Sequence, residues 1–121
     1  AIRWRHASHP NHLDLSRLPL TDDSLAAIPS DVSLLALVDT PVTDAGIGGL
    51  LRLQSLTRLN LAGTKVTDDG LQALAALPNL QWVCASRTQV TSEGVSRLNA
   101  ARPVMEVTIG FEPGLKPNTP T

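Results

Sequence analysis

The chain has 121 residues, a formal net charge of −1 at pH 7 and 42% hydrophobic residues, but only two Trp, one Phe and no Tyr. Its length predicts a single domain, and its charge offers no electrostatic basis for binding nucleic acid or an anionic membrane. No apolar run approaches the roughly 18 residues that a membrane span requires, and the single cysteine excludes an internal disulfide.

Residues 1–11 form an arm without acidic side chains ahead of the repeated part of the sequence. A repeat protein needs its first apolar layer covered, and Ile2 and Trp4 are the side chains available for this cap. The chain starts without an initiator Met or a secretory signal peptide. We therefore expect a processed product or a segment of a longer protein, and no compartment follows from the sequence.

Three histidines of this region, His6, His9 and His12, have the spacing H-x-x-H-x-x-H. Imidazole is a common metal ligand. Zinc sites, however, normally add Cys or carboxylate ligands in a closed arrangement, and Pro10 prevents one uninterrupted helix from aligning the three rings. The pattern favours a solvated arm over a metal site.

One phrase recurs three times at an interval of 24 residues: Thr40–Asp44, Thr64–Asp68 and Thr88–Ser92. An earlier copy starts at Leu13 and lies 22 residues ahead of its successor, so that its return segment is two residues shorter. Aliphatic residues keep the same interval at Leu35, Leu59, Val83 and Val107, at Leu37, Leu61, Ala85 and Ile109, at Ile47, Leu71 and Val95, at Leu50, Leu74 and Leu98, and at Leu56, Leu80 and Val104. A period of roughly 20–29 residues is typical of a leucine-rich-repeat solenoid.

Each copy has the pattern of a strand, a turn, a helix and a return segment. In the copy that starts at residue 57, Leu59 and Leu61 alternate with polar or small residues, which suits a short strand. Thr67 is a favourable N-cap for the helix that follows, and Asp68 places negative charge at the positive end of the helix dipole. Pro78 ends the helical pattern.

The segment from Leu56 to Leu71, LTRLNLAGTKVTDDGL, resembles the bacterial leucine-rich repeats that carry a TDxGL motif. These repeats are similar to the cysteine-containing repeats of eukaryotic F-box proteins. The resemblance extends over about residues 12–110 and implies generic partner binding. This sequence departs from the family where Thr40, Thr64 and Thr88 replace the usual Asn or Cys, and where Ser92 and Val95 replace Asp and Leu.

We therefore predict an α/β fold, a right-handed leucine-rich-repeat solenoid of about four repeats over residues 12–110. A short parallel sheet forms its concave face and helices form its convex face. Thr40, Thr64 and Thr88 are predicted to stack where the chain leaves each strand, and to bond main-chain groups there. The glycines Gly46, Gly70 and Gly94 are predicted to allow close approach between a helix start and the neighbouring turn.

The strand pattern also predicts which side chains face outward from the sheet. Strands about 4.8 Å apart place equivalent residues in continuous rows. The first row is His12, Leu34, Arg58, Trp82 and Glu106, the second is Asp14, Ala36, Asn60, Cys84 and Thr108, and the third is Ser16, Val38, Ala62 and Ser86. We expect an apolar centre made of Leu34, Ala36, Val38, Ala62, Trp82 and Cys84.

An exposed apolar patch usually marks a contact surface, and Trp and Arg are frequent anchors of binding energy. The predicted partner-binding residues are Leu34, Ala36, Val38, Arg58, Asn60, Trp82, Cys84 and Glu106. Two alternatives stay open: self-association through this face, or its cover by a terminal segment, because parallel strands are often buried on both sides.

The only thiol, Cys84, is the natural candidate for a nucleophile, and such a residue needs a base within hydrogen-bond reach. His12 is expected three strands away, at roughly 14 Å, and Asn60 is the nearest polar neighbour in the row. We therefore predict no enzyme, no catalytic residue and no cofactor.

Residues 111–121 form a polar, proline-rich tail that has little to bury. The function that these features favour is a non-enzymatic protein–protein interaction module that binds a protein or peptide on the concave sheet face. A structural spacer or an oligomerisation segment of a larger protein is the alternative, and the identity of the partner does not follow from the sequence.

Overall fold

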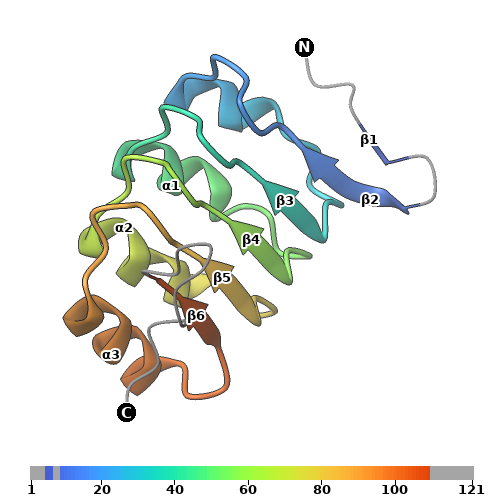
Figure 1. The fold of residues 1–121 in the computed structure, drawn as a ribbon. Helices are drawn as coiled ribbons and strands as arrows, with labels where there is room; N and C mark the ends of the chain where they lie inside the picture. The colour runs from blue at the N-terminus through green and yellow to red at the C-terminus, as the bar shows by residue number, and fades with distance from the viewer. Residues whose placement is uncertain (1–4, 7–8, 110–121) are drawn as a thin grey trace, which may run out of the picture.

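The computed structural model describes residues 5–6 and 9–109, with side chains for residues 11–109. The chain winds through successive turns, and each turn carries one strand and one helical segment (Figure 1). The elements in chain order are β1 (Arg5–His6), β2 (His9–Asp14), η1 (Asp22–Ala27), β3 (Leu34–Ala36), α1 (Asp44–Leu50), β4 (Arg58–Asn60), α2 (Asp68–Ala73), η2 (Leu74–Ala76), β5 (Trp82–Cys84), α3 (Ser92–Ala101) and β6 (Glu106–Thr108).

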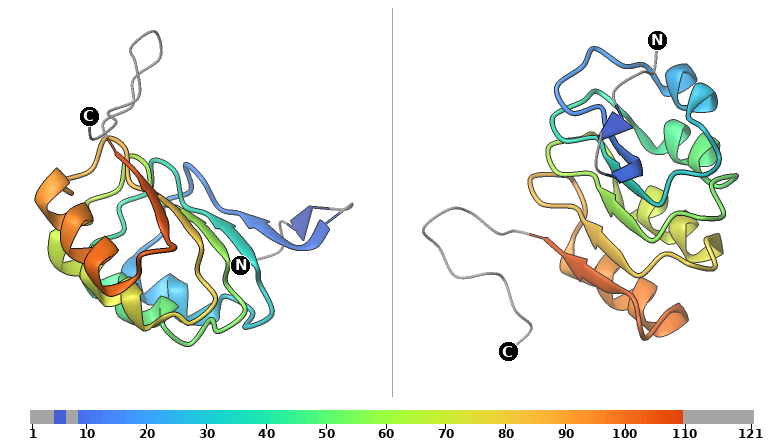
Figure 2. Two further views of the ribbon diagram at one scale, coloured as in Figure 1. Left: turned by 90° about the horizontal axis from the view of Figure 1, so that it is seen from below. Right: turned by 90° about the vertical axis from the view of Figure 1, so that its right-hand side faces the viewer.

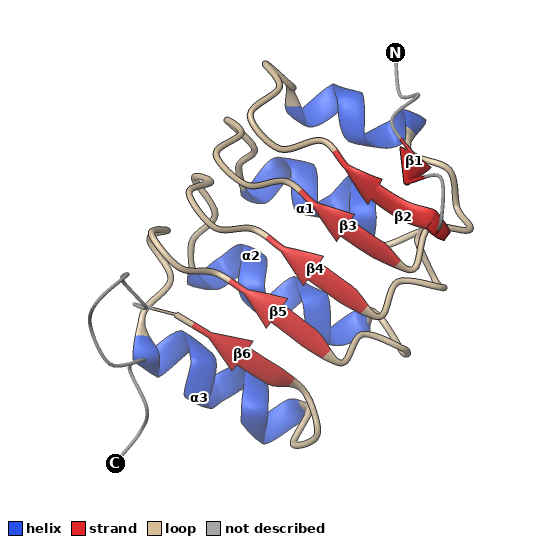
Figure 3. Ribbon diagram, turned by 45° about the vertical axis from the view of Figure 1, so that its right-hand side comes forward, coloured by secondary structure: helices blue, strands red, loops and turns tan. Residues whose placement is uncertain are grey.

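The six strands form one sheet in the order of the chain, and the helical segments lie on one side of it (Figures 2 and 3). β2 to β6 run parallel, whereas β1 pairs antiparallel with β2 at the sheet edge. The register follows the repeat, because Leu35 lies beside Leu59 and Leu59 lies beside Val83. The predicted α/β leucine-rich-repeat solenoid is confirmed.

The core fills the space between the sheet and the helical layer and is almost wholly aliphatic. Leu59 and Leu61 from the strand side meet Leu71 and Leu74 from the helical side, and none of these four side chains has exposed surface. This burial confirms the predicted register of the central copies. None of the described helices is long and apolar enough to cross a membrane.

The first copy has a 3₁₀-helix, η1, in place of an α-helix. η1 ends at Ala27 because Pro29 follows, and a proline disfavours the helical conformation of the residue before it. Ile28 is accordingly extended, with φ −68° and ψ 132°. Ile28 and Val32 are both buried, so the chain returns to the sheet by a shorter path.

The last copy departs from the predicted register at one position. Val104 is equivalent to the buried Leu56 and Leu80, yet it is 82% exposed, whereas Met105 is 3% exposed and joins the core. The cause is the longer helix: α3 continues to Ala101, and the turn that closes the copy is made from Met105 N to Arg102 O. The prediction that an apolar residue fills this core position was correct, but the residue is Met105 and not Val104.

Each of the first four parallel strands is followed by a turn residue with positive φ. These residues are Arg17 (63°), Asp39 (57°), Gly63 (74°) and Arg87 (56°). At Gly63 a side chain would overlap the Asp39 carboxylate. The absence of a Cβ at this position allows Asp39 to reach across it and pair with Arg87 at 3.0 Å. This ion pair joins turns that are two copies apart.

Candidate partner-binding surface

The sheet face is defined here as the outward strand positions of β2 to β6, opposite the helical layer. The strand register places them in the predicted rows. The first row runs through His12, Leu34, Arg58, Trp82 and Glu106, and the second through Asp14, Ala36, Asn60, Cys84 and Thr108. The rows therefore follow the repeat: equivalent residues are 22 positions apart from β2 to β3 and 24 apart at each later step.

Exposure on the sheet face differs between the rows. Arg58 and Glu106 are exposed, and the other predicted binding residues are partly exposed: Leu34, Ala36, Val38, Asn60, Trp82 and Cys84. Ala62 and Ser86 do not contribute to the face, because each is only 6% exposed. The Ser86 hydroxyl contacts the Cys84 thiol at 3.5 Å, so neighbouring groups cover Ser86 on the same side of the sheet.

The centre of the sheet face is a hollow formed beside a stacked pair. The Cζ atom of Arg58 lies 5.4 Å from the centroid of the Trp82 ring, which is the geometry of a cation–π contact. The hollow has a volume of about 220 Å³ and is lined by Leu34, Leu35, Ala36, Arg58, Asn60 and Trp82. It combines an apolar floor with two polar side chains from β4.

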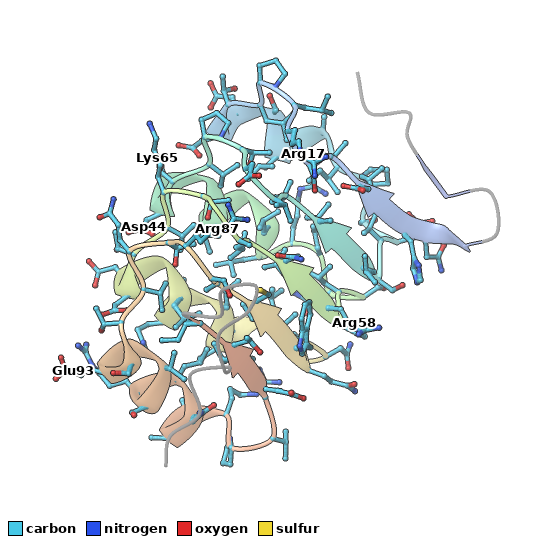
Figure 4. All side chains as sticks on the ribbon, in the orientation of Figure 1. Arg17, Asp44, Arg58, Lys65, Arg87 and Glu93 are labelled. Carbon is cyan, nitrogen blue, oxygen red and sulfur yellow. The ribbon has the colours of Figure 1, made fainter. Side chains whose placement is uncertain are left out.

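The two polar side chains keep hydrogen-bond donors available. The Oδ1 atom of Asn60 accepts from the N–H of Ala62 at 3.1 Å, which leaves the Nδ2 group as the free end of the amide. Within the part of the chain that the structure describes, neither this Nδ2 group nor the Arg58 guanidinium donates to another residue. Arg58 lies on the opposite side of the molecule from Asp44 and Lys65 (Figure 4).

Cys84 and His12 are not brought together. Cys84 is on β5 and His12 is on β2, with two strands between them. The Cys84 thiol instead contacts the Ser86 hydroxyl at 3.5 Å. No group of three or more His, Cys, Asp or Glu side chains within residues 11–109 could hold a metal ion. The side chains of His6 and His9 lie outside the described residues.

The helix starts carry a feature that the sequence analysis did not identify. Asp44, the first residue of α1, accepts hydrogen bonds from the N–H of Thr67 at 2.8 Å and from its hydroxyl, which belong to the next copy. Asp22 binds Thr43 and Asp68 binds Thr91 in the same two-pronged way. We call Asp22, Asp44 and Asp68 with their threonine partners the carboxylate ladder.

The carboxylate ladder extends the role predicted for these residues. Thr67 is the N-cap of α2 as expected, and its hydroxyl oxygen accepts from the N–H of Asp69. The aspartates were expected only to favour the helix dipole. At Asp68, the hydrogen bonds from the Thr91 hydroxyl and N–H hold the pKa of the carboxyl below its usual value. The recurrence of Thr and Asp at the same positions was the signal for this ladder.

The glycine of each helix start belongs to the same ladder. A Cβ at Gly70 would overlap the Asp44 carboxylate, and the same holds for Gly46 with Asp22 and Gly94 with Asp68. The predicted close approach is confirmed. The first copy has Ser24 at the equivalent position, and there the Ser24 hydroxyl accepts from the N–H of Thr21. A side chain is accommodated at position 24 because the described residues place no carboxylate of a preceding copy against it.

The threonines that follow the strands behave as predicted. Thr40 donates to Leu37 O at 2.8 Å, Thr64 to Leu61 O at 2.7 Å, and Thr88 to Ala85 O at 2.6 Å. Thr40 and Thr64 are buried. Each hydroxyl therefore satisfies a main-chain carbonyl of its own turn, and the role of these residues is structural.

Comparison with known proteins gives one finding. A family model described as "Leucine Rich repeat" matches residues 52–75, which cover β4, all of α2 and the start of η2. No curated protein matches the chain. The matched segment and the α/β solenoid together support a leucine-rich-repeat protein.

Proposed function

We propose that this chain is a non-enzymatic protein-interaction module that binds a protein or peptide on its sheet face. The observation that carries the proposal is the Arg58–Trp82 stack beside an apolar hollow. Arg and Trp are enriched among the residues that dominate binding energy, and both lie on the side of the sheet away from the helical layer. Leucine-rich repeats commonly act by partner binding, and the order of Thr67, Asp68, Gly70 and Leu71 supports the TDxGL type.

Trp82→Ala tests this function. The truncation should weaken partner binding by about 2 kcal/mol or more, as expected for a central aromatic anchor. It should change the free energy of unfolding by less than about 1 kcal/mol, because Trp82 lies outside the core. Quantitative capture from the source organism with wild type and the variant, together with thermal melts of both, measures the two effects.

The control for this experiment is Lys65→Ala, because Lys65 is exposed and lies far from Arg58 (Figure 4). Gln72 on the helical side is unsuitable, since its Nε2 group donates to Gly94 O at 2.8 Å. Equal capture by wild type and Trp82→Ala would remove the sheet face as the binding site. A large loss of stability in Trp82→Ala would instead assign the ring to the fold.

A spacer or oligomerisation segment is the second candidate function, and the last copy favours it. Val104 is 82% exposed, and Val107 and Ile109 are only partly buried, although their equivalents in the preceding copies are fully buried. Apolar surface of this kind on the last described copy suits contact with a further repeat or a second chain. Light scattering of wild type and Val104→Glu separates this candidate from the first, since only self-association through the end requires the valine.

A further inference from the structure

We infer that the partner presents an Asp or Glu side chain next to an aliphatic side chain, with the carboxylate at Arg58 and Asn60. The inference rests on the proposed function of the sheet face and specifies the chemistry of its occupant. It follows from the donors, the apolar walls and the position of charge around the hollow.

Arg58 has the charge and the donor geometry that suit a carboxylate. Its guanidinium lies over the Trp82 ring at 5.4 Å, and stacking uses the face of the planar group rather than its N–H bonds. A guanidinium carries five N–H donors in a fixed fork that matches the two oxygens of a carboxylate. The contact with Trp82 therefore places the charge beside the hollow, and the guanidinium keeps its N–H donors available to a ligand.

Asn60 supplies a second donor on the same side. Residues 58 and 60 of β4 are two apart and face the same way. The Oδ1 atom of Asn60 is already engaged by Ala62, so the amide offers its Nδ2 group. Two neighbouring donors without an acceptor between them select a ligand that accepts hydrogen bonds, and an ionised carboxylate is an acceptor only.

The apolar half of the site lies beside these donors. Leu34 and Ala36 of β3 are the register partners of Arg58 and Asn60, and they line the hollow together with Trp82. An aliphatic side chain of the partner would bury its surface there. A cationic group would be disfavoured because Arg58 already occupies a face of the Trp82 ring and repels like charge.

The nearest acids on the sheet face do not neutralise Arg58. Glu106 lies two strands away, beyond Trp82, and Asp14 uses its Oδ1 atom to accept from the N–H of Ser16. Two ion pairs within the described part of the chain, Asp39 with Arg87 and Glu93 with Arg97, do not involve Arg58. Arg58 is therefore the charge for which an external carboxylate is the complement.

Peptide selection tests the inference and does not require an identified partner. A random peptide library is selected on immobilised wild-type protein after counter-selection on Trp82→Ala, which discards peptides that bind elsewhere. The recovered peptides should be enriched in Asp or Glu adjacent to Leu, Ile or Val. A synthetic peptide from this pool is then titrated calorimetrically against wild type, Arg58→Gln and Lys65→Ala.

Arg58→Gln should weaken the synthetic peptide about tenfold or more, as expected when one member of a close charge pair is removed. Replacing the peptide carboxylate by its amide should cause a similar loss, and the two changes together should add little further. Lys65→Ala should bind like wild type. Arg58 is exposed, so the variant should fold, and its melting temperature verifies this.

The outcomes separate the inference from the function on which it rests. Trp82-dependent peptides without acidic enrichment, or with equal affinity for wild type and Arg58→Gln, would overturn the carboxylate inference and leave the binding face in place. Recovery of no Trp82-dependent peptide would overturn both.

Discussion

The carboxylate ladder at the helix starts and the sheet face are built from the same repeats, but the ladder keeps the same residues in each copy and the sheet face does not. In the ladder, an aspartate of one copy binds a threonine of the next three times over, with the same pair of hydrogen bonds. On the sheet face, the row that contains Leu34, Arg58 and Trp82 changes its chemistry at every strand. The recurring groups are satisfied within the chain, whereas the varying ones keep donors and apolar surface available. Repetition here indicates what stabilises the solenoid, and variation marks the surface to which the proposed function assigns partner binding.

The largest expected effect tests which strand residues point into the core and which point outward, since the contrast depends on this assignment. Leu59 is fully buried and lies between Arg58 and Asn60. Leu59→Ala should lower the free energy of unfolding by about 2–5 kcal/mol, because it removes buried surface and leaves a cavity. Val104→Ala, a truncation at an 82% exposed side chain, is the control and should change stability by about 0.5 kcal/mol or less. Urea denaturation measures the free energy of unfolding of both variants. Similar losses would contradict the assignment of Leu59 to the core and Val104 to the surface.

The second test concerns the carboxylate ladder. Asp44→Ala should cost about 1–3 kcal/mol, since it leaves the Thr67 donors unpaired. Gly70→Ala should cost about 1–3 kcal/mol through overlap with the Asp44 carboxylate. In the double variant the overlap is relieved, and the total loss should fall short of the sum by at least about 0.5 kcal/mol.

The control for this cycle is Gly48→Ala, because a Cβ at Gly48 would meet open space. This exposed helical position should gain up to about 1 kcal/mol from the higher helix propensity of alanine. Strict additivity of Asp44→Ala and Gly70→Ala in chemical denaturation would argue against a coupled carboxylate ladder.

A smaller effect is expected where the chain leaves a strand. Thr64→Val keeps the shape of the side chain but removes its hydrogen bond to Leu61 O. The expected loss is about 1 kcal/mol, because the N–H of Thr64 still donates to the same carbonyl at 3.2 Å. Lys65→Ala at the next, exposed position is the control. A melting temperature of Thr64→Val equal to that of wild type would show that the hydroxyl is dispensable.

The smallest effect is a pH dependence at the last step of the carboxylate ladder. The pKa of Asp68 is lowered by its hydrogen bonds to Thr91, so its carboxylate stabilises the folded state above the unfolded-state pKa of about 3.9. This contribution is lost as the pH falls through the lower folded-state pKa. Wild type should therefore exceed Asp68→Asn in stability at pH 7, and the gap should narrow below about pH 4. A gap that stays constant down to pH 3 would contradict the assignment.

The 24-residue period was sufficient to predict the solenoid, its strand register and the rows of the sheet face. This succeeded because parallel strands of equal repeats pair equivalent residues, so that Leu35, Leu59 and Val83 had to align. The period failed where local geometry changed within a copy. The extension of α3 exposed Val104, and Ala62 is only 6% exposed although its position in the row predicted an exposed side chain.

Contacts between copies were harder to predict than contacts within one copy. The bonds between Asp44 and Thr67 join residues 23 positions apart, and the sequence offered a simpler local role for the aspartate at the helix dipole. Likewise, the Nε2 group of Gln72 donates to Gly94 O of the next copy, and the sequence pattern did not predict this bond. The repeat identified which positions recur, but the three-dimensional structure was needed to show which neighbouring copy each side chain contacts.

The carboxylate ladder has a consequence for how such a chain could lengthen by duplication of its gene. Residues 44–67 are a 24-residue unit that begins with a carboxylate, Asp44, and ends with the threonine that binds it. A tandem copy of this unit would bring its own aspartate, its own Gly46 and its own threonine, so that every new junction would be complete at once. At the start of α3 the equivalent of the aspartate is Ser92, and a copy added after α3 would find no carboxylate at that position. The ladder therefore favours duplication of residues 44–67 over addition of a copy after α3.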